Sequence, residues 1–291
     1  MFRPRMVIGT LFGGASLLTT SLSMAAESRD AHAQAVKTFA NQSVLHMAAF
    51  GDSITRAFNT NGPKDHPWNS WATGNSDNVG LFRRGQVKSH AELLEETTGK
   101  QVVVHNVAKT GGKSTDLDEQ VEAVKAVPIH YATMLIGAND LCAHSKPLGD
   151  GKQSDMQQYT VRVERAIQKL IARNPSIKIL LVSIPDMPRL QRIGSGSSCQ
   201  VKWSRYGICQ NLLRDVISSD ELSIFEKQWQ NANDSLKDIA ARHPQHVLYN
   251  ARLAEYPFER DHLSDFDCFH PNIVGQNLLS SETWATGWWG H

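Results

Sequence analysis

The sequence predicts an α/β fold in which helices cover both faces of a mostly parallel β-sheet. Five short apolar runs are rich in Val, Ile and Leu and show little strict alternation, which is typical of strands buried on both faces. Three longer segments between them repeat apolar residues at three- and four-residue steps, the period of an amphipathic helix. No repeat, low-complexity tract or linker interrupts residues 27–291, so we expect a single domain.

The expected strands and helices alternate along the chain. The strands cover residues 44–50, 102–107, 132–136, 177–184 and 247–249. The helical patterns cover residues 117–124, 156–171 and 225–239. A proline follows each helical pattern within a few residues, and proline cannot continue a helix. This order favours parallel pairing, because parallel neighbours are joined by a connection that crosses over the sheet.

Composition and charge exclude several classes of protein. Of the 291 residues, 41% are hydrophobic and 20% are charged, which is typical of a chain that buries a core and not of a disordered segment or a coiled coil. The chain has 30 Lys and Arg against 29 Asp and Glu, a net charge of +1, and no block of like charge. We therefore expect neither nucleic acid nor an anionic membrane as an electrostatic partner.

The N-terminus has the pattern of a secretory signal peptide. Arg3 and Arg5 precede a mostly apolar stretch, Met6–Met24, which ends in small residues. The alternative is a transmembrane anchor, but glycines and hydroxyl residues dilute the stretch too much for a firm span of about 20 apolar residues. We expect residues 1–26 to be cleaved, leaving a secreted or periplasmic protein without a stable membrane anchor.

Four cysteines can form two disulfides in an oxidising compartment. Three pairings are open. Cys199 with Cys209 would close a short loop, and Cys142 with Cys268 would tie together two segments that carry candidate functional residues. The alternatives are free thiols or a metal site, but the spacing contains no C-x-x-C pair, so we expect disulfides and no metal.

Small and polar residues follow three successive strands. The first strand leads into Gly51-Asp52-Ser53-Ile54, the second into residues 106–112, and the third into Gly137-Ala138-Asn139-Asp140. Such residues are also the usual ones in turns, so any one of these segments alone would be weak evidence for a functional site. Ligands of open parallel sheets bind outside the carboxyl ends of the strands. These three segments therefore form a candidate site.

A fourth segment near the C-terminus adds a histidine with an acidic companion. Asp267 lies three residues before His270, so one turn of chain can bring the carboxylate to the imidazole and select its tautomer. A serine at one strand end and this pair at another could form a relay of nucleophile, base and orienting acid. The alternative for His270 is a structural histidine.

Together the four segments resemble the SGNH hydrolases, also called the GDSL family. Gly51-Asp52-Ser53-Ile54 is similar to the nucleophile motif, with Ile in the place of the usual Leu. Gly111 matches the glycine of the second motif, with Gly112 beside it, Gly137-Ala138-Asn139-Asp140 resembles the third, and Asp267-x-x-His270 resembles the last. The matches run in order from residue 51 to residue 270 and so span nearly all of the mature chain.

The resemblance implies a flavodoxin-like, three-layer α/β/α sandwich around a five-stranded parallel sheet. It also implies a serine esterase with Ser53, Asp267 and His270 as catalytic triad. The oxyanion hole would consist of the backbone N–H groups of Ser53 and Gly111 and the side-chain amide of Asn139. These groups suffice for acyl transfer, so we expect no cofactor and a small-molecule or lipid ester as substrate.

Flanking residues and aromatic side chains bear on the substrate. Residues 70–74, 137–142 and 267–271 resemble the phospholipase B-like branch, which implies phospholipid or lysophospholipid esters. Trp68 and Trp71 follow the nucleophile in a Gly- and Asn-rich stretch and are candidate substrate-binding residues, with ordinary packing as the alternative. The main alternative substrates are O-acetylated carbohydrates, which would make the protein a carbohydrate O-acetyl esterase. A non-catalytic carbohydrate- or lipid-binding module is the alternative to an enzyme.

Other chemistries fit the sequence less well. The segment around Lys113 resembles a phosphate-binding loop, but Val107 stands where that loop needs a glycine. The G-x-S-x-G elbow is missing, because Thr55 occupies the place of its second glycine. A metallohydrolase would require a ligand set made of Asp52, His262, Asp267 and His270. The serine relay explains the same residues with fewer assumptions.

Overall fold

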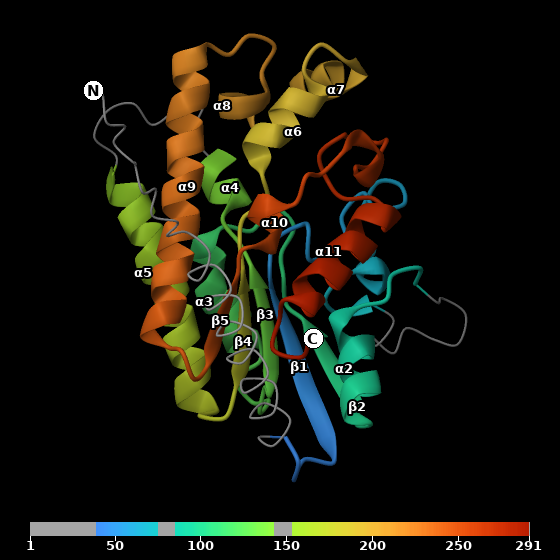
Figure 1. Cartoon of the computed structure of the whole chain (residues 1–291), viewed down its shortest axis with the longest axis vertical. Coiled ribbons are helices and arrows are strands. Elements are labelled where there is room, and N and C mark those ends of the chain that lie inside the picture. Colours follow the sequence, from blue (N-terminus) through green and yellow to red (C-terminus); the bar gives the residue numbers. More distant parts are fainter. Residues whose placement is uncertain (1–38, 75–84, 143–152, 291) are drawn as a thin grey trace, which may run out of the picture.

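Five parallel strands form the centre of the molecule (Figure 1). The computed structural model describes residues 39–74, 85–142 and 153–290; the expected signal peptide at residues 1–26 lies outside these ranges. The strands are β1 Val44–Gly51, β2 Gln101–Asn106, β3 Tyr131–Leu135, β4 Lys178–Val182 and β5 Val247–Asn250, in the order β2-β1-β3-β4-β5. Each expected strand is confirmed to within two residues at either end.

Helices cover both faces of the sheet, so the three-layer α/β/α sandwich is confirmed (Figure 1). One face carries α3 Leu117–Ala123, α5 Gln153–Arg173 and α9 Ser219–Arg242, which match the three expected helical patterns. The other face carries α2 His90–Thr98 and α11 Ile273–Ala285. Shorter helices cap the carboxyl ends of the strands and follow them: α4 Ala138–Cys142, α6 Met187–Gly194, α7 Ser198–Tyr206, α8 Gln210–Leu213 and α10 Arg252–Glu255.

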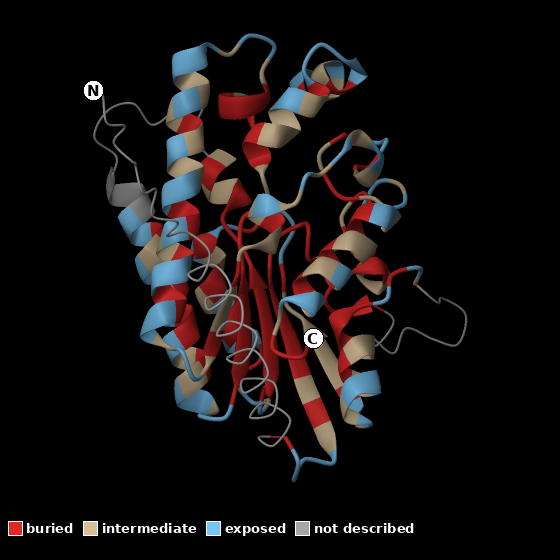
Figure 2. Cartoon of the chain, in the orientation of Figure 1, coloured by how far each residue is buried: buried red, intermediate tan, exposed pale blue. Residues whose placement is uncertain are grey.

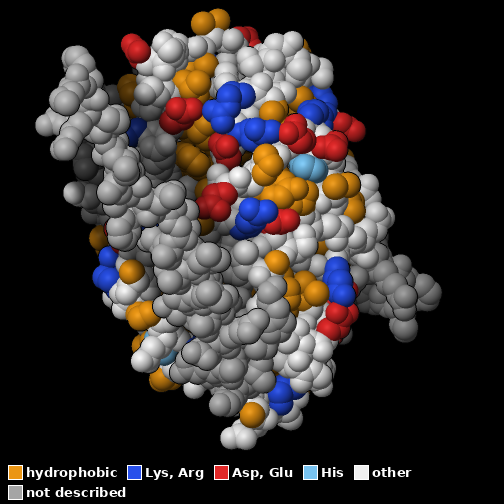
Figure 3. All heavy atoms as spheres, in the orientation of Figure 1, with side chains coloured by type: hydrophobic (Ala, Val, Ile, Leu, Met, Phe, Trp, Pro, Cys, Tyr) orange, Lys and Arg blue, Asp and Glu red, His pale blue; other side chains and the backbone are white. Residues whose placement is uncertain are grey.

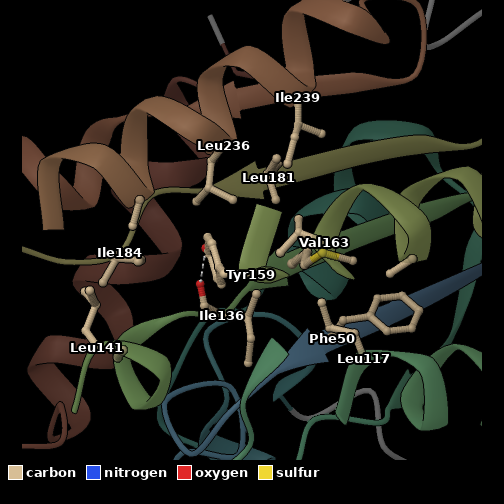
Figure 4. Packing of buried hydrophobic residues seen from close by; sticks show 14 of the residues in the cluster. Phe50, Leu117, Ile136, Leu141, Tyr159, Val163, Leu181, Ile184, Leu236 and Ile239 are labelled. Carbon is tan, nitrogen blue, oxygen red and sulfur yellow. Dashed lines mark hydrogen bonds between the residues drawn. The ribbon is translucent and has the colours of Figure 1, made fainter. Parts of the chain in front are cut away.

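Burial explains why apolar runs became strands. β3 and β4 are buried at every position, as their lack of alternation predicted (Figure 2). The larger of the two cores packs Leu181 and Leu236 between the sheet and α9, and Figure 4 shows Phe50 of β1 beside Leu117 of α3. Tyr159 of α5 belongs to the same core. The Tyr159 hydroxyl donates to the Ile136 carbonyl at 3.0 Å, so this buried polar group is satisfied at the end of β3.

The described surface carries both signs of charge. Lys and Arg side chains lie intermingled with Asp and Glu over the upper part of the face shown in Figure 3. This agrees with the net charge of +1. Within the described ranges, no helix combines the length and the apolar character that crossing a bilayer requires.

The strand order sets where a ligand can bind. The chain moves from β1 to β2 on one side and then returns to place β3 on the other side of β1. The loops after β1 and β3 therefore diverge and leave a crevice at this switch point, where open parallel sheets bind ligands. All strands are parallel, so the ends of β1, β2 and β3 lie at the same edge of the sheet.

Gly51 ends β1 in a conformation that other residues rarely adopt, with φ of +147°. A Cβ at this position would lie 2.3 Å from the carbonyl oxygen of Leu135 in β3. Gln120 of α3 holds the same peptide groups: its Oε1 accepts from Gly51 N and its Nε2 donates to Gly51 O, both at 2.9 Å. This packing fixes the direction in which the chain leaves β1.

We expect Gly51→Ala to lower the free energy of unfolding by more than the roughly 1–3 kcal/mol that backbone strain alone costs. The reason is that strain at φ of +147° adds to a clash with the neighbouring strand. Gly99→Ala is the matched control: Gly99 also has positive φ, +66°, but a Cβ there meets open space. Urea unfolding of both variants measures the difference. Equal losses of stability in the two variants would contradict a special role for the close approach at Gly51.

Candidate active site

Ser53 lies in the tight turn that follows β1 and is 5% exposed. Asp52 shapes this turn, because its Oδ1 accepts from Ile54 N at 2.9 Å and its carbonyl accepts from Arg56 N at 3.1 Å. Asp52 points into the protein and is 1% exposed. The turn thus buries the aspartate and leaves the serine side chain at the carboxyl edge of the sheet.

A continuous chain of hydrogen bonds joins Ser53, His270 and Asp267. His270 Nε2 lies 2.8 Å from Ser53 Oγ, and His270 Nδ1 lies 2.6 Å from Asp267 Oδ2. The His270 backbone N–H also donates to Asp267 Oδ1 at 3.0 Å, which closes the one-turn loop that the spacing of these residues predicted. The three groups therefore meet although Ser53 and His270 are 217 positions apart.

Asp267 is held as a carboxylate. Burial alone would raise the pKa of Asp267, but the hydrogen bond and charge of His270, together with Asn59 and the Phe269 N–H, outweigh it and lower the pKa below its usual value. Asn59 Nδ2 donates to Asp267 Oδ2 at 2.6 Å, and Phe269 N donates to Oδ1 at 2.9 Å. An ionised carboxylate at this place keeps the proton on His270 Nδ1 and leaves Nε2 free to accept from the serine.

The loop after β1 is joined to the histidine loop by more than this one amide. Ser264 Oγ donates to the Asn59 carbonyl at 2.7 Å, and Thr60 Oγ1 donates to the Pro271 carbonyl at 3.1 Å. Asn59 is a site residue that was not predicted, because nothing in the sequence links it to an aspartate 208 residues away. A weak signal exists: Asn59 has φ of +58°, a conformation that Asn tolerates better than most residues.

The three expected oxyanion-hole residues, Ser53, Gly111 and Asn139, line one cavity together with His270. This cavity has a volume of about 370 Å³. Within the described ranges, the backbone N–H groups of Ser53 and Gly111 donate to no protein acceptor. Gly112 N is already used, because it donates to Lys109 O at 2.7 Å. Of the two adjacent glycines, Gly111 is therefore the one with a free donor.

Asn139 is placed by contacts between the loops after β2 and β3. Its Nδ2 donates to the Gly112 carbonyl at 3.0 Å, which leaves the second N–H of this amide for a ligand. Beside it, the Asp140 carboxylate accepts from the backbone N of Ser114 at 2.9 Å and from the Ser114 hydroxyl at 2.6 Å. These bonds fix the two loops relative to each other.

The disulfides differ from the pairing that the sequence highlighted. Cys142 is bonded to Cys209, and Cys199 is bonded to Cys268. Helix α7 gives the reason: it separates Cys199, near its start, from Cys209, beyond its end, and a helix rises about 1.5 Å per residue. From Cys199 to Tyr206 the helix alone spans about 10 Å, whereas a disulfide joins Cα atoms less than about 7 Å apart. Each bridge instead ties the α7–α8 region to a segment that carries a candidate functional residue.

The two candidate tryptophans both make aromatic packing contacts. Trp71 is 0% exposed and packs edge-on against the buried His90 ring, with centroids 5.1 Å apart. Trp68 is half-buried and contacts His66 in the same way at 5.3 Å. Neither residue lines the cavity at Ser53. The packing alternative therefore holds for Trp71, whereas Phe58 places its ring edge against His270 at 5.1 Å.

Within the described part of the chain, no group of three or more His, Cys, Asp and Glu side chains is arranged to hold a metal ion. His262, which a metallohydrolase would use, instead accepts from the backbone N of Glu259 at 3.0 Å. Of the other three residues in that ligand set, Asp267 and His270 are hydrogen-bonded to each other, and Asp52 accepts from the backbone N of Ile54.

Asp52 makes the stability of the protein depend on pH. Burial raises the pKa of Asp52 to about 7, although the Ile54 N–H partly offsets it. Between about pH 4 and pH 7 the unfolded chain would release this proton while the folded chain keeps it, so the stability that Asp52 contributes is lost as pH rises. We expect wild type to lose stability relative to Asp52→Asn by up to about 1.4 kcal/mol per pH unit in this window. Urea unfolding of both proteins across this range measures the effect, and a constant difference would contradict it.

Comparison with known proteins places the chain in a family. The model of the GDSL-like lipase/acylhydrolase family matches residues 49–278. A crystal structure described as a GDSL-like lipase from Parabacteroides merdae is 17% identical, with a TM-score of 0.52, over 84% of this chain and 96% of that chain. The lipase Lip_vut3 from a goat rumen metagenome is also 17% identical, with a TM-score of 0.53, over 85% and 99% of the two chains.

At this identity the two crystal structures show a common fold. No curated protein matches the sequence. The family model, however, covers most of the chain and includes every segment that surrounds the cavity at Ser53. The chain therefore belongs to the GDSL-like lipase/acylhydrolase family.

Proposed function

We propose that this protein is an exported serine ester hydrolase that uses Ser53, His270 and Asp267 as its catalytic triad. The observation that carries the proposal is the unbroken relay from Ser53 Oγ through the imidazole to the Asp267 carboxylate, at 2.8 Å and 2.6 Å. A non-catalytic binding module would not need this alignment of three buried polar groups. Family membership supports the same reaction class.

The reaction begins when Ser53 Oγ attacks the ester carbonyl carbon and its proton passes to His270 Nε2. Negative charge then develops on the carbonyl oxygen, and the free N–H groups of Ser53, Gly111 and Asn139 stabilise it. One such donor contributes on the order of 10²–10³ in turnover. His270 returns the proton to the leaving alcohol, and an acyl-enzyme remains. A water molecule, activated by the same histidine, releases the acid and restores Ser53.

Export is supported by the cysteines together with the N-terminal sequence. All four cysteines form disulfides, which persist in compartments outside the cytosol. The pattern of residues 1–26 is that of a signal peptide. The protein would therefore work in the periplasm or outside the cell.

Lipid or lysophospholipid esters are the substrates that we favour, because the flanks of the motifs resemble the phospholipase B-like branch. Carbohydrate O-acetyl esters are the second candidate. The polar groups of Thr110, Lys113 and Asn139 along the cavity favour them, since these groups suit a hydroxyl-rich alcohol. Hydrolysis of acetylated sugars, p-nitrophenyl esters and lysophospholipids by one preparation would rank these classes.

We expect Ser53→Ala to reduce kcat for p-nitrophenyl butyrate by at least about 10⁴-fold, because no other group at the site supplies the nucleophile. Ser176→Ala, at an exposed turn on β4's amino side, is the matched control and should match wild type. Circular dichroism checks that both variants fold. Turnover by Ser53→Ala close to that of wild type would refute the mechanism.

The disulfide between Cys199 and Cys268 should contribute to activity as well as to stability. Cys268 lies between Asp267 and His270 and has φ of +56°, so its bond to α7 restrains the catalytic loop. We expect the double variant Cys199→Ser/Cys268→Ser to lose about 2–5 kcal/mol of stability. Its kcat should also fall at temperatures where circular dichroism shows it folded. An unchanged kcat in the folded variant would show that the bridge does not position the loop.

A further inference from the structure

A second, apolar cavity lies beside the catalytic relay. It has a volume of about 60 Å³. Three of its lining residues adjoin the proposed machinery in sequence: Ile54 follows Ser53, and Phe269 and Pro271 flank His270. Phe269 lines both this cavity and the larger one that contains Ser53. The two cavities therefore lie next to each other and share Phe269 as a lining residue.

Helix α6 forms one wall of the apolar cavity. Its side chains Met187, Leu190 and Ile193 recur at three-residue steps and all line the space. Leu279 of α11 and Ile54 line it from the other core, beside the sheet face that α11 covers. Figure 1 shows α6 above the carboxyl ends of the strands, with α10 below it and α11 to the right.

The lining of this cavity is chemically uniform. Asp186 is the one charged residue among the lining residues, and its side chain is already engaged, because Oδ1 accepts from Arg189 N at 2.8 Å as the cap of α6. The other lining side chains are hydrocarbon, aromatic or thioether. A cavity without free hydrogen-bonding groups favours an apolar ligand, since a polar ligand would lose its bonds to water.

We propose that this cavity binds the acyl chain of the ester and sets the chain length that the enzyme prefers. The inference rests on the proposed function, because it assumes an acyl group attached to Ser53. The alcohol belongs on the other side: His270, which must protonate the leaving oxygen, lines the larger cavity together with Gly111 and Asn139. An acyl chain that points away from the leaving oxygen would then enter the apolar cavity.

The size of the cavity limits the chain. A group of the size of a water molecule occupies about 10–15 Å³ of cavity volume. The cavity of about 60 Å³ therefore holds roughly four to six groups of this size. A methylene is of similar size. We therefore expect the gain per methylene to end at acyl chains of about four to eight carbons, and a longer lipid chain to be accepted with its remainder outside the cavity. An acetyl group would leave the cavity empty, and a much longer chain would extend beyond it and gain little.

Two ester series separate this proposal from general affinity for apolar molecules. In the first, the alcohol is p-nitrophenol and the acyl chain grows from two to sixteen carbons. In the second, the acyl group stays butanoyl and a linear alcohol grows over the same range. We expect kcat/KM to rise by up to about fourfold per methylene in the first series until the cavity is full, at about 0.8 kcal/mol per buried methylene. The second series should change much less.

Variants at Ile193 test whether this cavity is responsible. Ile193 is half-buried on α6, so a larger side chain can enter the cavity from its wall. Ile193→Trp should lower the preference for hexanoyl over acetyl esters at least about tenfold, and Ile193→Ala should move the optimum to longer chains. Val216→Trp is the control, since Val216 is 81% exposed and lines neither cavity; its profile should equal that of wild type.

The outcomes distinguish the two levels of the proposal. If wild type hydrolyses esters but its acyl profile is flat, or if neither Ile193 variant changes the profile, the cavity assignment is wrong and the serine mechanism stands. A profile that is steep in the alcohol series and flat in the acyl series would show that the cavity binds the alcohol instead. If wild type hydrolyses no ester at all, the proposed function fails, and the acyl assignment fails with it.

Discussion

The contact between Ser53 Oγ and His270 Nε2 brings together two loops that lie at opposite ends of the folded domain's sequence. Ordering a mobile loop or side chain costs conformational entropy. The contact is therefore more stable when the rest of the fold already holds both loops in place. The fold fixes the first loop through Gly51, which β3 and Gln120 hold in place. It fixes the second through the start of α11, where Asn272 accepts from Gly275 N at 2.9 Å directly after the histidine loop.

Two aspartates close to the serine show how one site treats the same side chain in opposite ways. Asp52 and Asp267 are both almost fully buried. Asp52 has few compensating partners, so burial raises its pKa to about 7. Asp267 receives N–H donors on both oxygens and faces an imidazole, so its pKa falls. The two pKa values differ because of hydrogen bonding and not because of the depth of burial. Asp52 therefore has a structural role, whereas Asp267 provides a negative charge beside His270.

Much of this arrangement could be predicted from the sequence, and the parts that could not have physical reasons. The strands were predictable because burial on both faces leaves continuous apolar runs, and α3, α5 and α9 because one apolar face repeats. The segment of Ser53 was recognisable because small and polar residues follow a buried strand there. The segment of His270 was recognisable because Asp267 precedes the histidine by three residues. Helices α6 to α8 are at most nine residues long, too short to show a clear period.

Contacts between distant segments escaped sequence analysis for a different reason. Asn59 pairs with Asp267 and Trp71 is enclosed against His90, and both facts depend on where the backbone passes in space. The disulfide pairing depends on the same thing, since α7 had to be placed before Cys199 and Cys209 could be separated. The apolar cavity has no sequence signature either, because residues from five separate segments line it.

The central claim is that Ser53 is the nucleophile, and covalent trapping tests it most directly. A fluorophosphonate reacts with an activated serine by forming an oxygen–phosphorus bond as fluoride leaves. After digestion, mass spectrometry should find the adduct on the peptide that contains Ser53, together with loss of ester hydrolysis in proportion to labelling. An active preparation that carries the adduct on another residue, or that stays unlabelled while it hydrolyses esters, would contradict the account.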